Sequence, residues 1–469
     1  MSPRLLTAAC LFTASCAAIA GAQDLPRGTI IEDVRCLNDA AQGYALYLPS
    51  TYTADRQWSV LIGFHPGARG RAIVEKYRAA AEQYGYVVAA SNNSRNGPWE
   101  VSMAAVKAMV PDLASRFSLD PNRVYLTGHS GGARVAMQVA LANKTIAGVI
   151  ASSGGYPDSQ PRAKVNFAVF GTAGTEDFNY IEMRMLDRKL TSPHHLAIFD
   201  GGHTLPPDAV ALEAIEWLEL QAMKSGRRTR DDALIQQLFD KRQRLIAEST
   251  NAADTVHRLE AVVADFSGLR DVTGEANRAT ELSRRQEVRK ALARERAADD
   301  SEAQMIAEFA GLEAGLLDDN RRAESLIGLR ERLSRLAQKA AEANESPERS
   351  QARRVLRTVT AGAAARVRDA DYRALLEQYG RVLTSFLHPR ELCCKAMRAS
   401  DAATSVNEQK VRPARMSATH DGRPHVLQVQ RTRRAHPGHP GARPDVAQPS
   451  IRPERLMGVR GAVLCAAAG

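Results

Sequence analysis

The chain has 469 residues, of which 44% are hydrophobic and 25% are charged. This balance is ordinary for a soluble protein, leaves room for two or three domains, and excludes a chain too polar to bury a core. The formal net charge is +10, but residues 395–469 hold thirteen Lys and Arg against five Asp and Glu, a net charge of +8. The rest of the chain is close to neutral, so its charge predicts no specific nucleic-acid binding.

The first 22 residues have the pattern of a secretory signal peptide. Arg4 supplies a positive charge, residues 5–20 are apolar or small, and Ala-Gly-Ala at 20–22 forms a small-residue cleavage site. We expect Gln23 to begin a mature chain that is exported, either to the periplasm or out of the cell. The alternatives are an apolar first helix of the fold and a lipoprotein acceptor at Cys16. No later run reaches membrane-spanning length.

The cysteines form no recognisable ligand pattern. No CxxC pair and no Cys/His spacing typical of a metal site is present, so we expect no metal, no cofactor and no disulfide framework. A bridge from Cys36 to a late cysteine stays open as an alternative. The remaining cysteines are Cys10, Cys16, Cys393, Cys394 and Cys465.

Residues 23–226 alternate short β-rich runs with helical stretches. This alternation predicts an α/β domain, with a mostly parallel sheet flanked by helices. Ligands of such sheets bind at the carboxyl ends of the strands. We expect strands over 43–48, 58–64, 86–90, 124–127, 148–152, 166–170 and 195–199, and helices over 72–84, 101–117 and 134–142.

Residues 227–390 have a different pattern. Strand signals vanish, and apolar residues recur at spacings of three and four, which predicts amphipathic helices. Breaks are expected near Asp299, Asp318 and Asn344. A helical bundle or a coiled-coil-like array is the natural interpretation, with a repeat solenoid as a minor alternative. Such helices would pair chains or attach the protein to the cell envelope.

Residues 391–469 lose all periodicity and are rich in Pro, Arg, Gly and His. This composition predicts a disordered basic tail that would contact anionic surfaces. The same composition arises when a GC-rich gene is read in a shifted frame, and the sequence leaves that alternative open.

The five residues Gly-His-Ser-Gly-Gly at 128–132 match the G-x-S-x-G nucleophile elbow. A predicted strand precedes them and a predicted helix follows. The chemistry needs this shape, because a tight turn with small neighbours exposes the serine and aims the helix N-terminus at a developing oxyanion. We therefore predict Ser130 as the nucleophile, with a chance Gly-Ser loop as the alternative.

A nucleophilic serine needs a base, and the base needs an orienting acid. In this arrangement the acid and the histidine follow later strands, in that order. Asp177 follows the strand predicted at 166–170, and His203 follows the one at 195–199. They are the predicted acid and base. The adjacent Glu176 is an alternative acid, and a surface-loop role is the alternative for His203.

The oxyanion needs two backbone N–H donors. One is expected from Gly131, directly after the serine. The other is expected from the loop after the strand at 58–64, where Pro66 has no N–H, so that Gly67 or Ala68 must donate. His65 is expected to brace this loop.

Four other residues near these motifs have structural alternatives. Trp99 and His129 are candidates for lining the substrate pocket, but each could simply pack in the fold. His194 and His195 border a predicted strand and are expected to be structural.

Residues 120–132 resemble the elbow region of the polyhydroxybutyrate-depolymerase-like and feruloyl-esterase-like branch of α/β hydrolases, and residues 199–203 are similar to its histidine loop. The likeness covers about residues 29–220. It implies a secreted carboxylic-ester hydrolase with a Ser-His-Asp triad. His-Pro-Gly at 65–67 departs from the more usual His-Gly, and Gly174 stands where many relatives carry the acid.

The sequence thus favours two-step acyl transfer on an ester substrate. No extended cap lies between Gly155 and Val165, so we expect an open site that suits bulky or polymeric esters. One alternative is a peptidase or amidase on the same triad. Another is an inactive hydrolase domain joined to a helical scaffold or envelope-binding module.

Overall fold

The computed structural model of the protein describes residues 25–158, 160, 162–361 and 369–384. The predicted signal peptide and the predicted basic tail lie outside these residues, as does every cysteine except the buried, unpaired Cys36. None of the helices in the described ranges is both long enough and apolar enough to cross a membrane.

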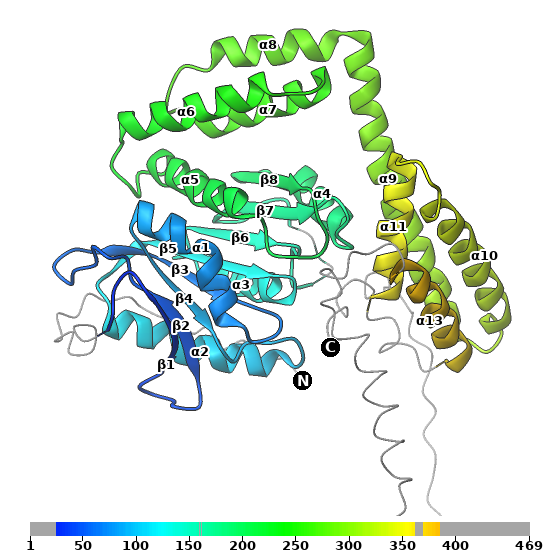
Figure 1. The fold of residues 1–469 in the computed structure, drawn as a ribbon, viewed down its shortest axis with the longest axis horizontal. Coiled ribbons are helices and arrows are strands. Elements are labelled where there is room, and N and C mark those ends of the chain that lie inside the picture. The colour runs from blue at the N-terminus through cyan, green and yellow to red at the C-terminus, as the bar shows by residue number, and fades with distance from the viewer. Residues whose placement is uncertain (1–24, 159, 161, 362–368, 385–469) are drawn as a thin grey trace, which may run out of the picture. The chain divides into compact units, whose positions relative to one another are not determined.

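An eight-stranded sheet forms the centre of the first domain (Figure 1). Its strand order is β1-β2-β4-β3-β5-β6-β7-β8. β2 runs antiparallel to its two neighbours, and all other pairs are parallel. This is the α/β-hydrolase fold. The strands are β1 (Ile30–Arg35), β2 (Gly43–Tyr47), β3 (Trp58–Phe64), β4 (Tyr86–Ser91), β5 (Leu119–His129), β6 (Gly148–Ser152), β7 (Ala168–Gly174) and β8 (His194–Phe199).

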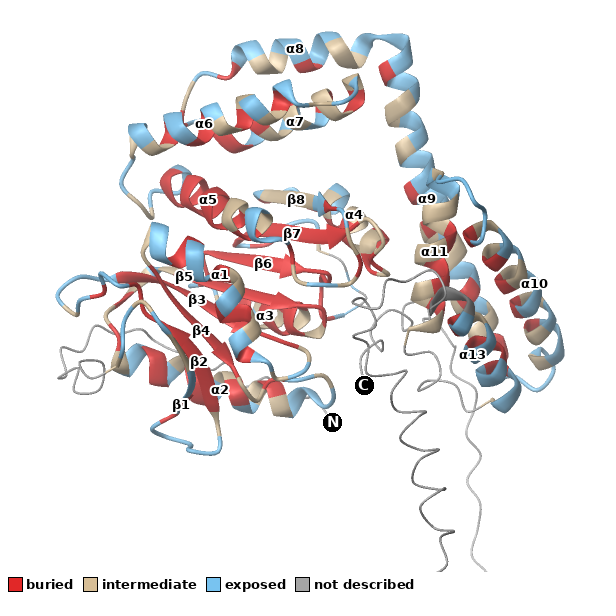
Figure 2. Ribbon diagram, viewed as in Figure 1, coloured by how far each residue is buried: buried red, intermediate tan, exposed pale blue. Residues whose placement is uncertain are grey.

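Helices cover both faces of the sheet. One face packs against α2 (Trp99–Arg116), α3 (Gly131–Ala142) and α4 (Tyr180–Lys189). The other packs against α1 (Gly70–Tyr84) and α5 (Asp208–Lys224). The central strands are therefore buried throughout (Figure 2).

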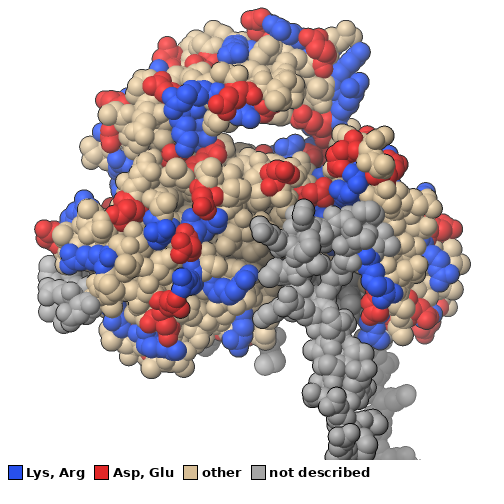
Figure 3. Space-filling view, in the orientation of Figure 1, with Lys and Arg blue, Asp and Glu red and all other residues tan. Residues whose placement is uncertain are grey.

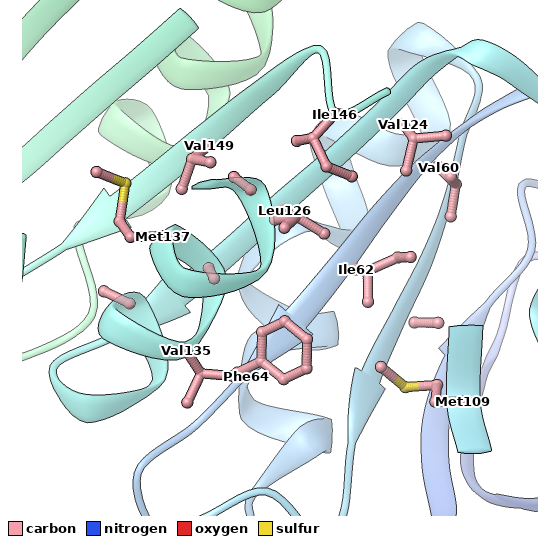
Figure 4. Packing of buried hydrophobic residues seen from close by; sticks show 14 of the residues in the cluster. Val60, Ile62, Phe64, Met109, Val124, Leu126, Val135, Met137, Ile146 and Val149 are labelled. Atoms are coloured by element: carbon pink, nitrogen blue, oxygen red, sulfur yellow. The ribbon is translucent and has the colours of Figure 1, made fainter. Parts of the chain in front are cut away.

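Strand β3 shows how the sequence produces these layers. Successive side chains of a strand point to opposite faces. Val60, Ile62 and Phe64 belong to the cluster that includes α2 and α3, whereas Leu61 belongs to the cluster that includes α1. Figure 4 shows Phe64 beside Val135 of α3. A strand buried on both faces has a continuous apolar sequence.

The seven predicted strands and three predicted helices occur with small shifts at their ends. The largest shift is in β5, which was expected at 124–127 but begins at Leu119. Strand β7 was expected at 166–170 but continues to Gly174. Its last residues are Gly-Thr-Ala-Gly, which strand propensity does not mark, yet all of them are buried. The edge strand β1 and the helices α4 and α5 were not predicted.

The rest of the described chain is helical, as expected. Helices α6, α7 and α8 share one apolar cluster with the end of α5, and helices α9, α10, α11 and α13 share another. The helices are α6 (Asp232–Ala247), α7 (Ala252–Phe266), α8 (Thr273–Arg284), α9 (Gln286–Gly315), α10 (Arg322–Ala340), α11 (Pro347–Thr360) and α13 (Ala370–Thr384).

The break expected near Asp299 is absent, because α9 runs through it without interruption. Asp299 and Glu302 are buried rather than solvated. Arg184 of α4 pairs with Asp299 at 3.0 Å, and Arg354 of α11 pairs with Glu302 at 2.6 Å. These buried carboxylates are stabilised within the helix by arginines of neighbouring helices, which the sequence pattern could not indicate.

A mostly buried histidine joins the sheet to the following helices. His195 of β8 lies 3.6 Å from Glu213 of α5 and 3.5 Å from Asp265 of α7, and its ring stacks on Phe170. Burial alone would lower its pKa, but the hydrogen bonds and charges of Asp265 and Glu213 outweigh burial and raise the pKa to about 9. His195 is therefore a mostly buried cation with a structural role.

This cation makes stability depend on pH. Because the folded pKa is raised above the ordinary value of 6.5, its contribution is complete below pH 6.5 and is lost as the pH rises through about 9. We expect the free energy of unfolding to fall by up to about 3 kcal/mol across this window, measured by urea unfolding. His195→Gln should remove most of the slope, and an unchanged slope in that variant would contradict the assignment.

Candidate active site

The predicted triad and the predicted oxyanion turn follow the carboxyl ends of parallel strands. Residues 65–68 follow β3, Ser130 follows β5, Asp177 follows β7 and His203 follows β8. Because these strands run in one direction, their ends meet at the same edge of the sheet. The sheet thus gathers side chains from four separate parts of the sequence.

Ser130 lies in a strained turn between β5 and α3. Its φ of 53° and ψ of −121° are values that a residue with a side chain rarely adopts. Its N–H donates to Ser152 O at 2.8 Å. A methyl group on Gly128 would overlap the Gly132 carbonyl, and one on Gly132 would overlap the Phe64 carbonyl. Both positions therefore require glycine because backbone atoms of neighbouring segments leave no room for a side chain. This explains the two glycines of the G-x-S-x-G motif.

Backbone strain is concentrated around this turn. Three non-glycine residues in the described part of the chain have positive φ: Ala68 at 54°, Ser130 at 53° and Ser153 at 56°. They follow β3, β5 and β6, which are neighbours in the sheet. Strained backbone of this kind persists where the surrounding structure enforces it, and it clusters at functional sites.

His203 and Asp177 form a close pair. His203 Nδ1 lies 2.7 Å from Asp177 Oδ1, and the same oxygen accepts from the Asn179 N–H at 2.8 Å. Asp177 is fully buried. Because a carboxylate only accepts, Nδ1 carries the proton of this bond and Nε2 is left as the basic nitrogen.

The His203 ring lies beside the elbow. It stacks on Phe178 with the ring centroids 3.8 Å apart, and it lies 4.8 Å from the ring of His129, which precedes Ser130 in the chain. Among the described residues, no hydrogen bond joins His203 to Ser130. Such bonds are often long before substrate binds and tighten in the complex.

The two candidate acids have different partners. The Glu176 carboxylate pairs with Arg357 of α11 at 2.8 Å, while the Asp177 carboxylate accepts the hydrogen bond from His203.

Gly174, where many relatives carry the acid, packs against the histidine loop. A methyl group on Gly174 would overlap the Gly201 carbonyl, so this position has no room for a carboxylate.

The turn after β3 is braced by His65, as expected. Its Nδ1 accepts from the Gly67 N–H at 2.9 Å, and its carbonyl accepts from the Ala68 N–H at 3.1 Å. Burial and the charge of Arg69 lower the pKa of His65 to about 4, so its ring is neutral and can accept. Both predicted second oxyanion donors therefore already have an acceptor within their own turn, a difference from our expectation.

Asn96, which the sequence did not single out, lies against the elbow. Its N–H donates to Pro66 O at 2.8 Å, and a methyl group on Gly131 would overlap its side-chain oxygen. The Gly131 N–H opens α3, where the first N–H groups have no acceptor within the helix. A carboxamide supplies two N–H donors. The Gly131 N–H and the Asn96 carboxamide, whose oxygen is the atom against Gly131, therefore lie next to each other at the elbow.

His129 is buried, with its ring 6.1 Å from His65 and 4.8 Å from His203. Burial, with the charges of His203, His65 and Arg69, lowers its pKa well below the ordinary value. A neutral His129 adds no positive charge beside His203. Trp99 begins α2 and is 42% exposed, so it is not part of a core.

Two other groups of ionisable side chains in the described ranges lie away from this edge of the sheet. A hollow of about 460 Å³ lies near the start of β5, where Arg123 and Arg228 both pair with Glu219. His194 and Asp187, 3.8 Å apart, lie at the start of β8. On the face shown in Figure 3, basic and acidic side chains of the described residues are interspersed.

A scan against protein-family models finds no match, and neither does a search of curated proteins. Solved structures of similar fold include three esterases. A feruloyl esterase module from Clostridium thermocellum, in complex with sinapinate, is 16% identical over 40% of this chain and 85% of its own, with a TM-score of 0.33. Esterase B from Lactobacillus rhamnosis is 14% identical over 44% and 92%, with a TM-score of 0.35. A Pyrobaculum calidifontis esterase is 10% identical over 42% and 86%, with a TM-score of 0.34.

Proposed function

We propose that this protein is a serine hydrolase that cleaves carboxylic esters through an acyl-enzyme intermediate. Ser130 is the nucleophile, His203 the base and Asp177 the orienting acid. The observation that carries the proposal is the 2.7 Å bond between Asp177 and a histidine whose ring lies beside a strained elbow serine. An elbow, a base and an orienter are the parts that acyl transfer needs.

In the first step, His203 Nε2 takes the proton of the Ser130 hydroxyl as its oxygen attacks the ester carbonyl. Asp177, through Nδ1, stabilises the imidazolium that forms. The tetrahedral intermediate then collapses, and His203 gives its proton to the departing alcohol. Water repeats the sequence on the acyl-enzyme and releases the acid.

The oxyanion of each tetrahedral intermediate needs donors that are already in place. We assign the Gly131 N–H as one donor and the Asn96 carboxamide as the other. The N–H groups of Gly67 and Ala68 both donate hydrogen bonds to His65. Either one could donate to the oxyanion only after its hydrogen bond to His65 breaks. Asn96 would donate through its Nδ2, which must face the oxyanion in place of the Oδ1 that now lies against Gly131.

We also propose an open site for bulky or polymeric esters in an exported enzyme. Between β6 and β7, the described residues form no helix that could act as a cap. The exposed Trp99 begins α2, three residues after Asn96, where it would contact a large acyl or alcohol group. Export rests on the signal-peptide pattern of the first 22 residues.

Ser130→Ala is the primary test. We expect it to reduce turnover of p-nitrophenyl esters by at least about 10⁴-fold and to abolish labelling by a fluorophosphonate probe. Unchanged turnover would overturn the proposal. Cleavage rates of the native protein on a panel of ester and peptide substrates test the peptidase alternative. Faster cleavage of peptides than of esters would favour a peptidase.

Asp177→Asn and Glu176→Gln form a matched pair, since each replaces one carboxylate by an amide in adjacent positions. We expect Asp177→Asn to lower kcat by about 10³–10⁴-fold, because an amide does not stabilise the required tautomer of His203. Glu176→Gln should retain kcat within about tenfold, a cost of no more than about 1.4 kcal/mol. A larger loss of kcat in Glu176→Gln than in Asp177→Asn would identify Glu176 as the catalytic acid.

Asn96→Ala tests the second oxyanion donor. Loss of one donor should lower kcat by about 10²-fold while KM changes little, because the bond forms mainly in the transition state. Urea unfolding of the variant serves as the control for folding. A kcat within twofold of the native value would indicate that the second oxyanion donor is an N–H group of the turn after β3.

A further inference from the structure

The loop that carries Asp177 is held from two sides. On one side its N–H groups donate to the histidine loop: Thr175 N to Phe199 O and Glu176 N to Gly201 O, each at 2.8 Å. These bonds tie the proposed acid to the proposed base. They use only the N–H groups of this loop, so its carbonyl groups remain available as acceptors for other partners.

On the other side, those carbonyls accept hydrogen bonds from α11. Arg354 donates to Thr175 O at 3.0 Å, and Thr358 Oγ1 donates to Phe178 O at 2.8 Å. Arg357 donates to the carbonyl of Glu176, the residue between them in the loop, and pairs with its carboxylate at 2.8 Å. Three residues around Asp177 are thus bonded to one helix about 180 positions later in the chain.

This helix is itself firmly anchored. Arg354 makes paired bonds of 3.0 Å and 2.6 Å to the buried carboxylate of Glu302 on α9, and its guanidinium lies 4.2 Å from the Tyr180 ring of α4. Arg184 and Arg188 of α4 pair with Asp299 and Asp300 of α9. Because paired Arg–carboxylate bonds set direction as well as distance, α11 is a rigid support.

We propose that α11 positions the catalytic acid, so that the helical region is a working part of the hydrolase. The inference rests on the proposed function. A loop whose carbonyls would otherwise face solvent is mobile, and a displacement of about 1 Å in a catalytic constellation can cost about 10²-fold in rate. Arg354, Arg357 and Thr358 are positioning residues that act through the loop.

Helix α11 also supports the proposed base, His203, through Phe178. Thr358 holds the carbonyl of Phe178, and the Phe178 ring stacks on His203 at 3.8 Å. Moving Phe178 would release both the ring that supports His203 and the loop that presents Asp177. The expected defect therefore lies in the chemical step rather than in substrate binding.

Thr358→Val is the sharpest test, and Thr360→Val is its matched control. Both threonines lie on α11, and each hydroxyl can donate to the carbonyl four residues earlier, but the single proton of Thr358 Oγ1 can go instead to Phe178 O, at 2.8 Å. We expect Thr358→Val to lower kcat about tenfold with KM unchanged, which is a loss of about 1.4 kcal/mol of transition-state stabilisation. Fluorophosphonate labelling of Ser130 should slow in parallel. Thr360→Val should leave both rates unchanged, and Thr358→Ser should restore them.

A second pair tests the charged contact without leaving a buried carboxylate unpaired. The double variant Arg354→Met with Glu302→Gln removes the bond to Thr175 O, whereas Arg349→Met removes a similarly buried Arg of α11 whose partners are Ala340 and Glu345. We expect kcat to fall about 10²-fold in the first variant only.

The outcomes separate the two proposals. Normal kcat in Thr358→Val and in the double variant, together with an inactive Ser130→Ala, would overturn the role of α11 and leave the hydrolase assignment intact. Equal loss in a variant and its control would also overturn it, because the helix would then matter only for stability. An active Ser130→Ala would remove the proposed function and this inference together.

Discussion

The close approach of backbone at the elbow is the constraint on which the first domain depends. Gly128 and Gly132 face each other across the turn, and Gly132 also lies against the carbonyl of Phe64 at the end of β3. The ends of β3 and β5 and the start of α3 are therefore fixed relative to one another by contacts that no larger residue allows. The positive φ of Ser130 and the position of the turn that follows β3 are consequences of this packing.

The same principle operates at the other half of the site. Gly174 packs against the Gly201 carbonyl, so the loops after β7 and β8 lie in direct backbone contact. Position 174 has no space for a side chain, and the acid that we propose, Asp177, lies three residues later. The departure from the pattern of the relatives that the sequence resembles is thus a consequence of local packing, and it places the acid where α11 can hold it.

The sequence predicted features that are local or periodic. Strands buried on both faces appear as apolar runs, and the elbow is confined to residues 128–132, so β3, β5 and α3 were predictable. Contacts between distant segments were not. Little in the sequence near Asn96 marks its approach to Gly131, and Asp299, which suggested a break in α9, is buried against Arg184. An Asn shortly before Gly-Pro-Trp, after a buried strand, was the one available signal.

The late position of α11 in the chain has a consequence for the timing of maturation. Ser130, Asp177 and His203 have all been synthesised by residue 203, but the helix that we propose as their support ends at residue 360. A growing or translocating chain would therefore carry a complete set of reactive groups for about 150 residues before the acid is held in place. On this proposal the enzyme would reach its full rate only after the last helices have packed.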